Sequence, residues 1–152
     1  MRALIQRVSE ARVSVGGAIV GSIGEGLLVL LGVGKDDSER EADILAEKIA
    51  NLRIFDDDAG KMNRSLMDVQ GGMLVVSQFT LYADTRRGRR PSYISAAPPD
   101  EANRLYEYFK EQVESTGIKV ESGEFQAMMD VALINNGPVT IWLDTEDLKK
   151  EK

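Results

Sequence analysis

Two short stretches, residues 77–81 and 136–140, hold the residue types best suited to chemistry in this chain. The first reads Ser-Gln-Phe-Thr-Leu and the second reads Asn-Gly-Pro-Val-Thr, each beside an apolar, strand-like run. The 152 residues contain no histidine and no cysteine, which excludes imidazole bases, thiolate nucleophiles and the commonest zinc ligands. Any reaction must therefore use backbone amides, hydroxyls, carboxylates, Arg or Lys, or a group on the substrate.

The first stretch follows directly on the apolar run Met-Leu-Val-Val at residues 73–76. A strand end that presents consecutive backbone N–H groups can hold a developing oxyanion without any titratable side chain. Ser77, Gln78 and Thr80 would add donors and acceptors, and Phe79 would anchor the segment. A plain polar strand end fits the same residues, so the residue types leave both interpretations open.

The second stretch is more constrained, because Gly137 tolerates unusual φ angles while Pro138 fixes its own φ and lacks an N–H donor. A rigid, donor-poor pair of this kind could recognise a small group by excluding anything larger. A hairpin turn that leads into the last strand is the alternative, and the spacing fits it as well.

The formal net charge of −6 argues against a surface built for general nucleic-acid binding. One basic run contrasts with it, because Arg86, Arg87, Arg89 and Arg90 fall within five residues. Neighbouring guanidinium groups repel one another, so the run is either a solvated surface turn or a contact for phosphate. No signal-peptide core is present, and the longest apolar run, residues 27–31, is too short to span a bilayer. We therefore expect a cytoplasmic protein.

Hydrophobic spacing predicts strands over residues 4–8, 12–15, 18–23, 27–33 and 73–79, and two late strands over 127–134 and 139–143. Helical spacing predicts one helix after the cap residues 36–38 and another that opens at Pro98 and ends by Gly117. Helices that lie between strands indicate an α/β or α+β domain with mixed strand pairing. We expect one domain over residues 1–145, followed by a charged tail, 146–152, that frays.

Several motifs, taken in order, give the chain an end-to-end resemblance to D-aminoacyl-tRNA deacylases. They are the two stretches above together with Gln6-Arg7-Val8, Gly60-Lys61-Met62-Asn63, Gly88-Arg89-Arg90-Pro91-Ser92 and the segment from Phe125 to Val131. The resemblance implies a homodimer with a three-layer α/β/β fold, its helices on one side of mixed β-sheets. It also implies hydrolysis of the ester between a D-amino acid and the 3′-terminal adenosine of tRNA. We expect no cofactor, no metal ion, and no DNA or membrane partner.

The resemblance further implies roles for individual residues. The Gly137-Pro138 pair, which is cis in the family, would enter the pocket of the partner subunit and exclude an L side chain there. The residues that it would meet are the catalytic set Ser77, Gln78, Phe79 and Thr80. Arg7 would hold the Gly-Pro loop, Asn136 would belong to the same substrate-binding group, and Met129 and Phe125 would lie near the adenine. Phosphates of the tRNA would be bound by Arg86, Arg87, Arg89 and Arg90.

An aminoacyl ester is already activated, so the resemblance implies catalysis by the substrate's own 2′-hydroxyl and a bound water. The backbone amides of Phe79 and Thr80 would stabilise the oxyanion. We expect Thr80 to position rather than attack, because no general base is evident to activate it. A site that excludes side chains should also admit glycyl-tRNA. The chain departs from the usual pattern at Gln126, where Gly is common, and at Asn136, where Asp often precedes the Gly-Pro pair.

Two alternatives to a deacylase remain open at the level of sequence. One is a non-catalytic module that binds tRNA or a nucleotide and has kept the pocket without turnover. The other is a ligand-binding dimer unrelated to tRNA. Turnover separates the enzyme from the first alternative, and loss of tRNA affinity on Arg89→Ala and Arg90→Ala separates both from the second.

Overall fold

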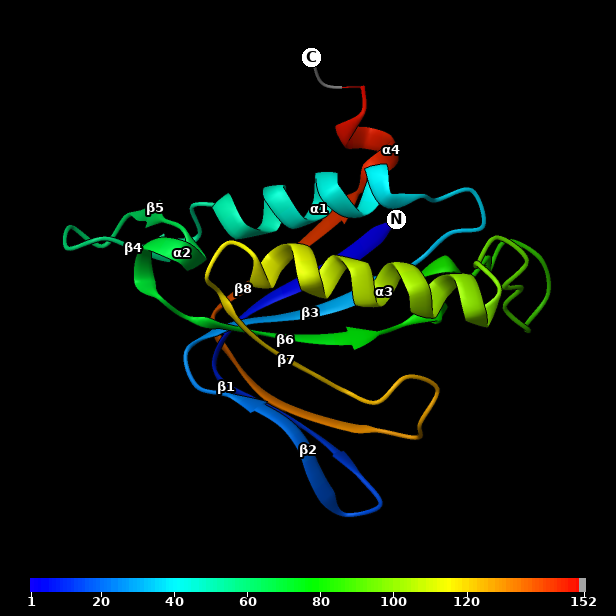
Figure 1. Ribbon diagram of the computed structural model, residues 1–152, viewed down its shortest axis with the longest axis horizontal. Coiled ribbons are helices and arrows are strands. Elements are labelled where there is room, and N and C mark those ends of the chain that lie inside the picture. Colours follow the sequence, from blue (N-terminus) through cyan, green and yellow to red (C-terminus); the bar gives the residue numbers. More distant parts are fainter. Residues whose placement is uncertain (151–152) are drawn as a thin grey trace.

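A computed structural model describes residues 1–150 of the chain. Two long helices lie over one face of a mixed sheet (Figure 1). In chain order, the elements are β1 (Arg2–Val15), β2 (Ala18–Ile23), β3 (Gly26–Gly32), α1 (Glu39–Asn51), β4 (Phe55–Asp56), β5 (Met62–Arg64), α2 (Leu66–Val69), β6 (Gly72–Ser77), the 3-10 helix η1 (Phe79–Tyr82), α3 (Pro99–Glu114), β7 (Lys119–Ser122), β8 (Asp130–Asp144) and α4 (Thr145–Leu148). Within the described residues, no helix is both long and apolar enough to cross a membrane.

Both long helices begin where local chemistry favours a helix start. Ser38 caps α1 in a reciprocal capping box with Glu41, which satisfies backbone N–H groups that have no partner inside the helix. Pro99 is the first residue of α3, where its missing N–H costs nothing. One face of each helix is buried against the sheet, including Leu45 of α1 and Phe109 of α3.

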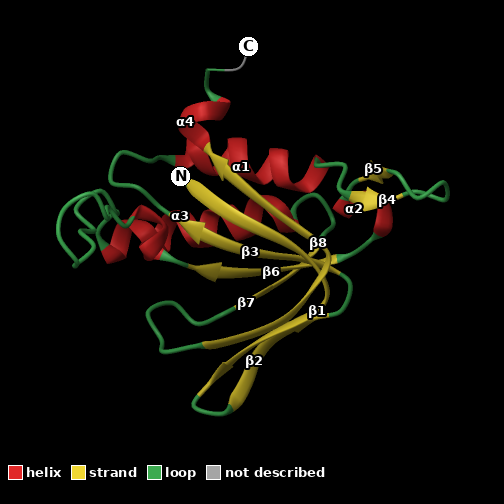
Figure 2. Ribbon diagram, turned by 180° about the vertical axis from the view of Figure 1, so that it is seen from behind, coloured by secondary structure: helices red, strands yellow, loops and turns green. Residues whose placement is uncertain are grey.

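Strand β1 organises the sheet because both of its halves are paired on two sides. Residues 2–8 pair with β3, residues 11–15 pair with β2, and both halves pair with β8, all antiparallel. Strands β3, β6 and β7 continue the sheet in parallel. Register shifts beside Val8 in the β1–β8 ladder mark bulges, which bend a strand. The far half of β1 therefore swings away from the helices and carries β2 beneath β6 (Figure 2).

Two buried clusters show that the molecule has three layers. The larger one lies between the sheet and the helices and includes Val29, Leu45 and Phe109. The second lies on the opposite face of the same strands, where Leu28, Leu74 and Val76 pack against the far half of β1. Helices, sheet and the curled second half of the sheet form an α/β/β arrangement, as the sequence predicted.

The structure corrects several predicted element boundaries. The strands expected at 4–8 and 12–15 are one strand, as are those expected at 127–134 and 139–143. The hairpin-turn alternative for residues 136–140 is therefore wrong, because the bulged β1–β8 ladder continues past this segment. Strand β6 ends at Ser77 rather than Phe79.

The short elements β5, α2, η1 and β7 were not anticipated, whereas β4 lies where the sequence at Ile54-Phe55 indicates the end of a strand. The expectation that the chain frays from residue 146 is wrong for the described part of the tail, where Asp144 caps helix α4 through the N–H of Glu146. Lys149 then pairs with Glu41 of α1 at 2.7 Å. Residues 151 and 152 lie outside the described part.

Candidate active site

The segment that follows β6 opens onto a cavity of about 610 Å³. It brings together five of the predicted site residues, Ser77, Gln78, Phe79, Phe125 and Met129. The remaining lining residues are mostly apolar and small: Val33, Val76, Tyr93, Ala96, Ala97, Pro99, Ala102, Gln126, Ala127 and Val131. No carboxylate, Lys or Arg is among these described lining residues, so the cavity suits an uncharged, partly aromatic group.

The position of this segment follows from the buried strand before it. The N–H of Gln78 donates to the carbonyl of Leu31 at 2.8 Å, which extends the parallel pairing one residue beyond Ser77. The chain then turns into η1, whose first N–H groups, those of Phe79 and Thr80, have no acceptor within the helix. The Phe79 side chain is 56% exposed and meets Tyr93 edge-on, with the ring centroids 5.0 Å apart.

The hydroxyl of Thr80 is oriented by its neighbour. The side-chain amide of Gln78 donates to Thr80 Oγ1. The Thr80 hydroxyl is the acceptor in this bond, so its own proton can be donated to another group. Among the side-chain hydrogen bonds of the described residues, none links Thr80 to a group that could act as a general base.

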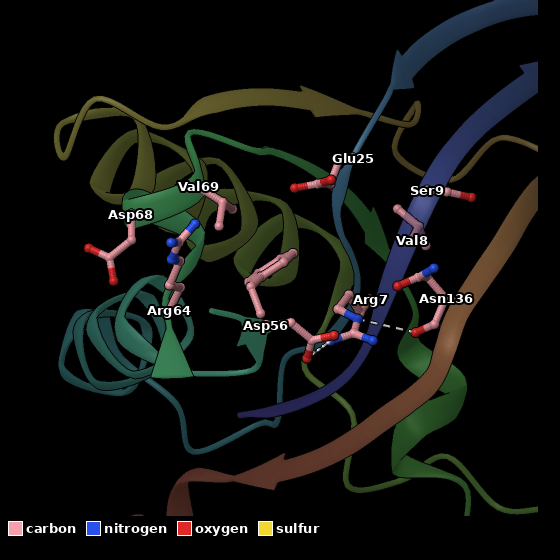
Figure 3. Close-up of a pocket in the computed structure, with 10 residues that line it drawn as sticks. Arg7, Val8, Ser9, Glu25, Asp56, Arg64, Asp68, Val69 and Asn136 are labelled. Atoms are coloured by element: carbon pink, nitrogen blue, oxygen red, sulfur yellow. Dashed lines mark hydrogen bonds and ion pairs between the residues drawn. The ribbon is translucent and has the colours of Figure 1, made fainter. Parts of the chain in front are cut away.

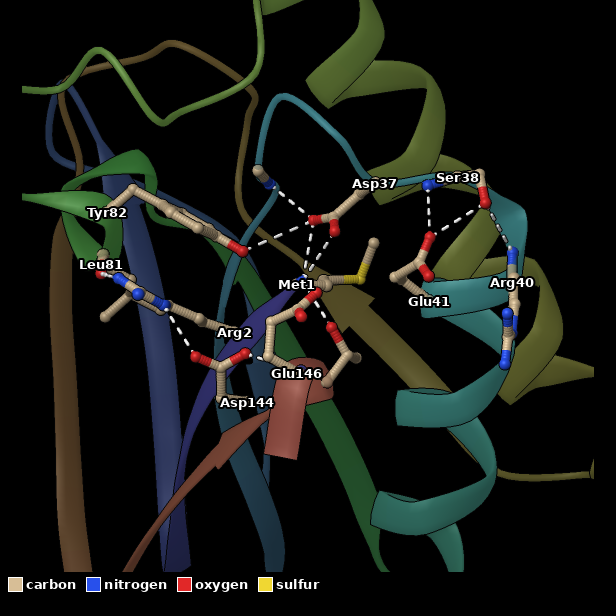
Figure 4. A network of polar contacts seen from close by, with 12 residues as sticks. Met1, Arg2, Asp37, Ser38, Arg40, Glu41, Leu81, Tyr82, Asp144 and Glu146 are labelled. Carbon is tan, nitrogen blue, oxygen red and sulfur yellow. Dashed lines mark hydrogen bonds and ion pairs between the residues drawn. The ribbon is translucent and has the colours of Figure 1, made fainter. Parts of the chain in front are cut away.

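A polar network at the start of β1 holds η1 in place (Figure 4). Arg2 donates to the carbonyl of Leu81 at 2.9 Å and to Asp144 at 3.1 Å. Its guanidinium carbon lies 4.4 Å from the centroid of the Tyr82 ring. Burial, followed by the charge of Asp37, raises the pKa of the Tyr82 phenol well above its usual range. Tyr82 is therefore neutral, and its ring packs against Arg2 at the end of η1.

The second stretch lies in the middle of β8, far from a strand end. Gly137 has a φ of +121° and its peptide bond to Pro138 is cis, and both residues are exposed. Beneath them, Arg7 is only 8% exposed. Its Nε donates to the carbonyl of Asn136 at 3.2 Å, and its Nη1 donates to the carbonyl of Ile54 at 2.8 Å.

Figure 3 shows the guanidinium of Arg7 between Asn136 and Asp56, whose Oδ1 lies 3.4 Å from Nη1. These three residues line a second cavity, of about 520 Å³, whose other lining residues include Glu25, Arg64 and Asp68. The lining of this cavity is mostly polar and charged, whereas the lining of the first cavity is mostly apolar. Neither cavity counts Thr80, Gly137 or Pro138 among its lining residues.

Sequence reasoning missed Asn135, which braces the same segment. Its side-chain Oδ1 accepts from the N–H of Val139 at 3.3 Å, and its Nδ2 donates to Thr140 Oγ1 at 2.9 Å. The side chain thus spans the Gly-Pro pair. The available signal was an Asn directly after the apolar run at residues 131–134, because Asn is disfavoured in a strand unless its amide makes a local hydrogen bond.

The pairing of the strands shows how far apart residues 77–81 and 136–140 lie within one chain. Ser77 lies level with Leu31 of β3, which lies level with Ala3 of β1. Asn135 lies level with Val8 of β1. Five residues separate Ala3 from Val8, which is about 17 Å along a strand. The two stretches therefore lie well apart along the strands, Ser77 near one end of the sheet and Asn135 near its middle.

The basic run lies on an exposed loop. Arg86 pairs with Asp84 at 2.8 Å, and this hydrogen-bonded pair lowers the pKa of Asp84 to about 2. In the ion pairs formed by residues 1–150, Arg87, Arg89 and Arg90 do not take part. Three guanidinium groups are therefore available to an external anion. No group of three or more acidic residues within the described chain is arranged to hold a metal ion.

Comparison with known proteins shows which family the chain resembles over most of its length. The family described as D-Tyr-tRNA(Tyr) deacylase matches residues 4–144. The D-aminoacyl-tRNA deacylase of Thermomicrobium roseum is 61% identical over 149 residues, which are 98% of this chain and 97% of that protein. The protein of the same name from Roseiflexus castenholzii is 64% identical over 145 residues, which are 95% of this chain and 92% of that protein.

Two solved structures share the fold. One, named "c-Myc DNA Unwinding Element Binding Protein", superimposes with a TM-score of 0.89 at 41% identity and covers 95% of this chain and 98% of its own. The other, a probable eukaryotic D-amino acid tRNA deacylase, has a TM-score of 0.80 at 17% identity, with 93% and 97% covered. At that identity the second likeness concerns the fold alone.

Proposed function

This chain belongs to the D-Tyr-tRNA(Tyr) deacylase family, and on that premise we propose that it hydrolyses the ester bond of D-aminoacyl-tRNA. The products are a free D-amino acid and tRNA, so the reaction removes the wrong enantiomer before it reaches a growing protein. The proposed setting is the cytoplasm, where aminoacyl-tRNA is used. The observation that carries the proposal is the apolar cavity beside Ser77, Gln78 and Phe79, in a chain with this family membership.

The cavity is suited to the aminoacylated end of a tRNA. Unpaired bases are bound in proteins by stacking on aromatic side chains, and Phe125 and Met129 supply apolar surface in the same cavity as Phe79. We place the terminal adenine against Phe125 and Met129. The ester then lies toward the segment Ser77–Thr80, where the backbone N–H groups are.

The distance between the two stretches supports a site built from two chains. About 17 Å of strand separates them along the sheet, so Gly137 cannot approach the Phe79 loop of its own chain. Strand β8 pairs only with β1 among the described strands, and it exposes Ile134 and Trp142 at 54% and 47%. We propose a homodimer in which each Gly137-Pro138 pair enters the partner's cavity.

In this arrangement the protein discriminates by exclusion. A Gly-Pro pair offers a rigid backbone that cannot move aside for an L side chain, whereas a D side chain points the other way. Glycine has no side chain to exclude, so we expect glycyl-tRNA to be hydrolysed as a side activity. D-Tyrosyl-tRNA and glycyl-tRNA, assayed side by side, test this point.

The chemistry needs no titratable protein group. The substrate's 2′-hydroxyl and a water supply the nucleophile, and the N–H groups of Phe79 and Thr80 stabilise the charge that develops on the carbonyl oxygen. The Thr80 hydroxyl, held by Gln78, orients the substrate. Thr80→Ala should therefore retain measurable activity, and a trapped acyl-Thr80 ester would show instead that Thr80 attacks.

The exposed arginines provide the proposed contact with tRNA phosphates. The chain carries a net charge of −6, so binding must rely on this local run (Arg86, Arg87, Arg89 and Arg90) rather than on the whole surface. Replacing Arg89 and Arg90 by Ala should weaken tRNA binding and reduce its salt dependence by roughly one charge contact per residue. We propose tRNA and a second copy of this chain as partners, not DNA; the DNA element in the name of the solved relative belongs to that protein.

Single-turnover deacylation of D-tyrosyl-tRNA and L-tyrosyl-tRNA by the purified, metal-free protein tests the proposed function. Rapid loss of the D-ester alone is the expected result. Survival of both esters would indicate a binding protein without turnover, and equal loss of both would remove the proposed role of the Gly-Pro pair.

A further inference from the structure

Gln126 has a backbone conformation that L residues with side chains rarely adopt. Its φ is +65°, in the left-handed region, which a non-glycine residue occupies at a cost in free energy. The N–H of Ala127 donates to the carbonyl of Glu124 at 3.1 Å, so Gln126 occupies a tight turn between β7 and β8. Glycine would adopt this conformation without penalty, and the glutamine side chain therefore calls for an explanation.

The place of Gln126 in the lining of the cavity suggests an explanation. Gln126 is one of three lining residues with an amide or an aliphatic hydroxyl, the others being Ser77 and Gln78. The amide of Gln78 is already engaged with Thr80. Among the side-chain hydrogen bonds of the described residues, none involves Gln126. Gln126 is exposed, and its amide is an uncommitted donor and acceptor at the wall of the cavity that Phe125 and Met129 also line.

Resting on the proposed function, we propose that Gln126 recognises the terminal adenine of the substrate through its side-chain amide. A glutamine amide can accept from the N6 amino group of adenine while donating to a neighbouring ring nitrogen. Stacking on Phe125 would hold the base but would not distinguish adenine from another purine. Gln126 is therefore a specificity residue, and its strained backbone is the cost of placing an amide at this point.

Gln70 provides a matched control in the same chain. It is the other non-glycine residue with a positive φ within residues 1–150, at 53°. Its conformation is the ordinary one at the end of a helix, because it terminates α2 and its N–H donates to the carbonyls of Leu66 and Met67. Gln70→Gly and Gln126→Gly make the same substitution at the same type of backbone conformation.

The test measures binding of two non-hydrolysable probes by isothermal titration. They are 3′-deoxy-3′-(D-tyrosylamino)adenosine and its inosine counterpart, which replaces the N6 amino group by an oxygen. We expect the wild-type protein to prefer the adenosine probe by roughly tenfold, as one good amide contact to a base allows. Gln126→Gly should bring the two affinities to within about twofold, whereas Gln70→Gly should keep the preference.

Urea unfolding of the same proteins provides the second measurement. Removing strain should raise the unfolding midpoint of Gln126→Gly, so this variant should be more stable and less selective. An unchanged preference for adenosine in Gln126→Gly would overturn the proposal, as would a wild-type protein without any preference. Because the probes are not hydrolysed, failure of the deacylase proposal would appear only in the turnover assay and would leave this test intact.

Discussion

The loop after β6 and the Gly-Pro segment of β8 achieve rigidity in opposite ways. The loop follows a mostly buried parallel strand and opens onto an apolar cavity, and the first backbone N–H groups of η1 have no acceptor within that helix. The Gly-Pro segment is exposed in mid-strand and is supported from beneath by the buried guanidinium of Arg7. In the proposed mechanism, one region stabilises charge and the other resists movement, and the proposed site is complete only when two chains meet.

The largest effect should come from a change at the tip of the Gly-Pro segment. A Cβ at Gly137 would lie 2.9 Å from Val139 Cγ2 and 3.0 Å from Arg7 Nη2, at a φ of +121°. Gly137→Ala should therefore lower single-turnover deacylation by about 100-fold, the scale of a 1 Å misplacement. We expect a stability loss of about 1–3 kcal/mol from the strained backbone.

Gly60→Ala is the control for backbone strain alone. Gly60 also has a positive φ, +76°, but an added Cβ would meet no atom within 4 Å. It should lose about 1 kcal/mol of stability at most and keep full activity. Equal losses of activity in the two variants would mean that the position of the Gly-Pro segment is irrelevant.

The next largest effect should come from the support beneath the segment. Arg7→Met removes the donors to the carbonyls of Asn136 and Ile54, and a buried carbonyl left without a donor, here that of Ile54, costs about 1–3 kcal/mol. The ratio of D-ester to L-ester hydrolysis should fall by roughly tenfold, because a mobile Gly-Pro pair excludes less well. Arg7→Lys keeps the charge but not the planar fork; full selectivity in that variant would show that charge alone is sufficient.

Asn135 should make a smaller contribution of the same kind. Asn135→Ala removes both side-chain contacts to Val139 and Thr140, with an expected loss of about 1 kcal/mol in urea unfolding. The D-to-L ratio should fall severalfold. Asn51→Ala, which removes one exposed amide contact on α1, should leave the ratio unchanged. If both variants left it unchanged, the assigned role of Asn135 would be wrong.

The smallest effect should come from the ion pair between Glu41 of α1 and Lys149 at the end of α4. Burial opposes ionisation of Glu41, but hydrogen bonds from Lys149 and Ser38 outweigh it and lower the pKa of Glu41 to about 2 from an ordinary 4.5. Because the folded pKa is the lower one, this stabilisation is present above pH 4.5 and is lost as the pH falls toward 2.

Lys149→Ala should therefore cost up to about 1 kcal/mol near pH 7. The difference in the free energy of unfolding between Lys149→Ala and the wild type, measured in urea, should become smaller below pH 4.5. The rate of deacylation should be the same in both proteins. A difference that stays constant over this range would show that the Glu41–Lys149 pair is not its source.

Local chemistry made much of this fold predictable from sequence. Three local patterns each favour a single structure. The capping residues of α1 favour a helix start, Gly16 and Gly17 favour a tight turn, and the apolar run of β3 favours a buried strand. The continuity of β1 and β8 was not predictable, because it depends on bulges beside Val8 that arise only when the two strands pair. For the same reason Asn136 and Pro138 resembled a turn.

The site was predictable in its residue types but not in its layout. Ser77, Gln78 and Phe79 share a cavity with Phe125 and Met129, although about fifty residues of chain lie between the two groups. The support of Gly-Pro by Arg7 followed from the resemblance, and the structure has the contact at 3.2 Å. The bracing by Asn135 depends on side-chain geometry that no spacing rule reveals.

Complementation between two strongly impaired variants tests the central claim most directly. Ala96→Trp fills the cavity, which Ala96 lines, and Gly137→Ala disables the Gly-Pro segment. Each variant alone should have at most about a hundredth of the wild-type rate. After the two are unfolded and refolded together, mixed dimers carry one intact site, formed by the cavity of one chain and the Gly-Pro pair of the other. We predict recovery of roughly a quarter of the wild-type rate, since about half of the dimers are mixed and each has one working site of two. No recovery, with mixed dimers present, would contradict a site shared between chains.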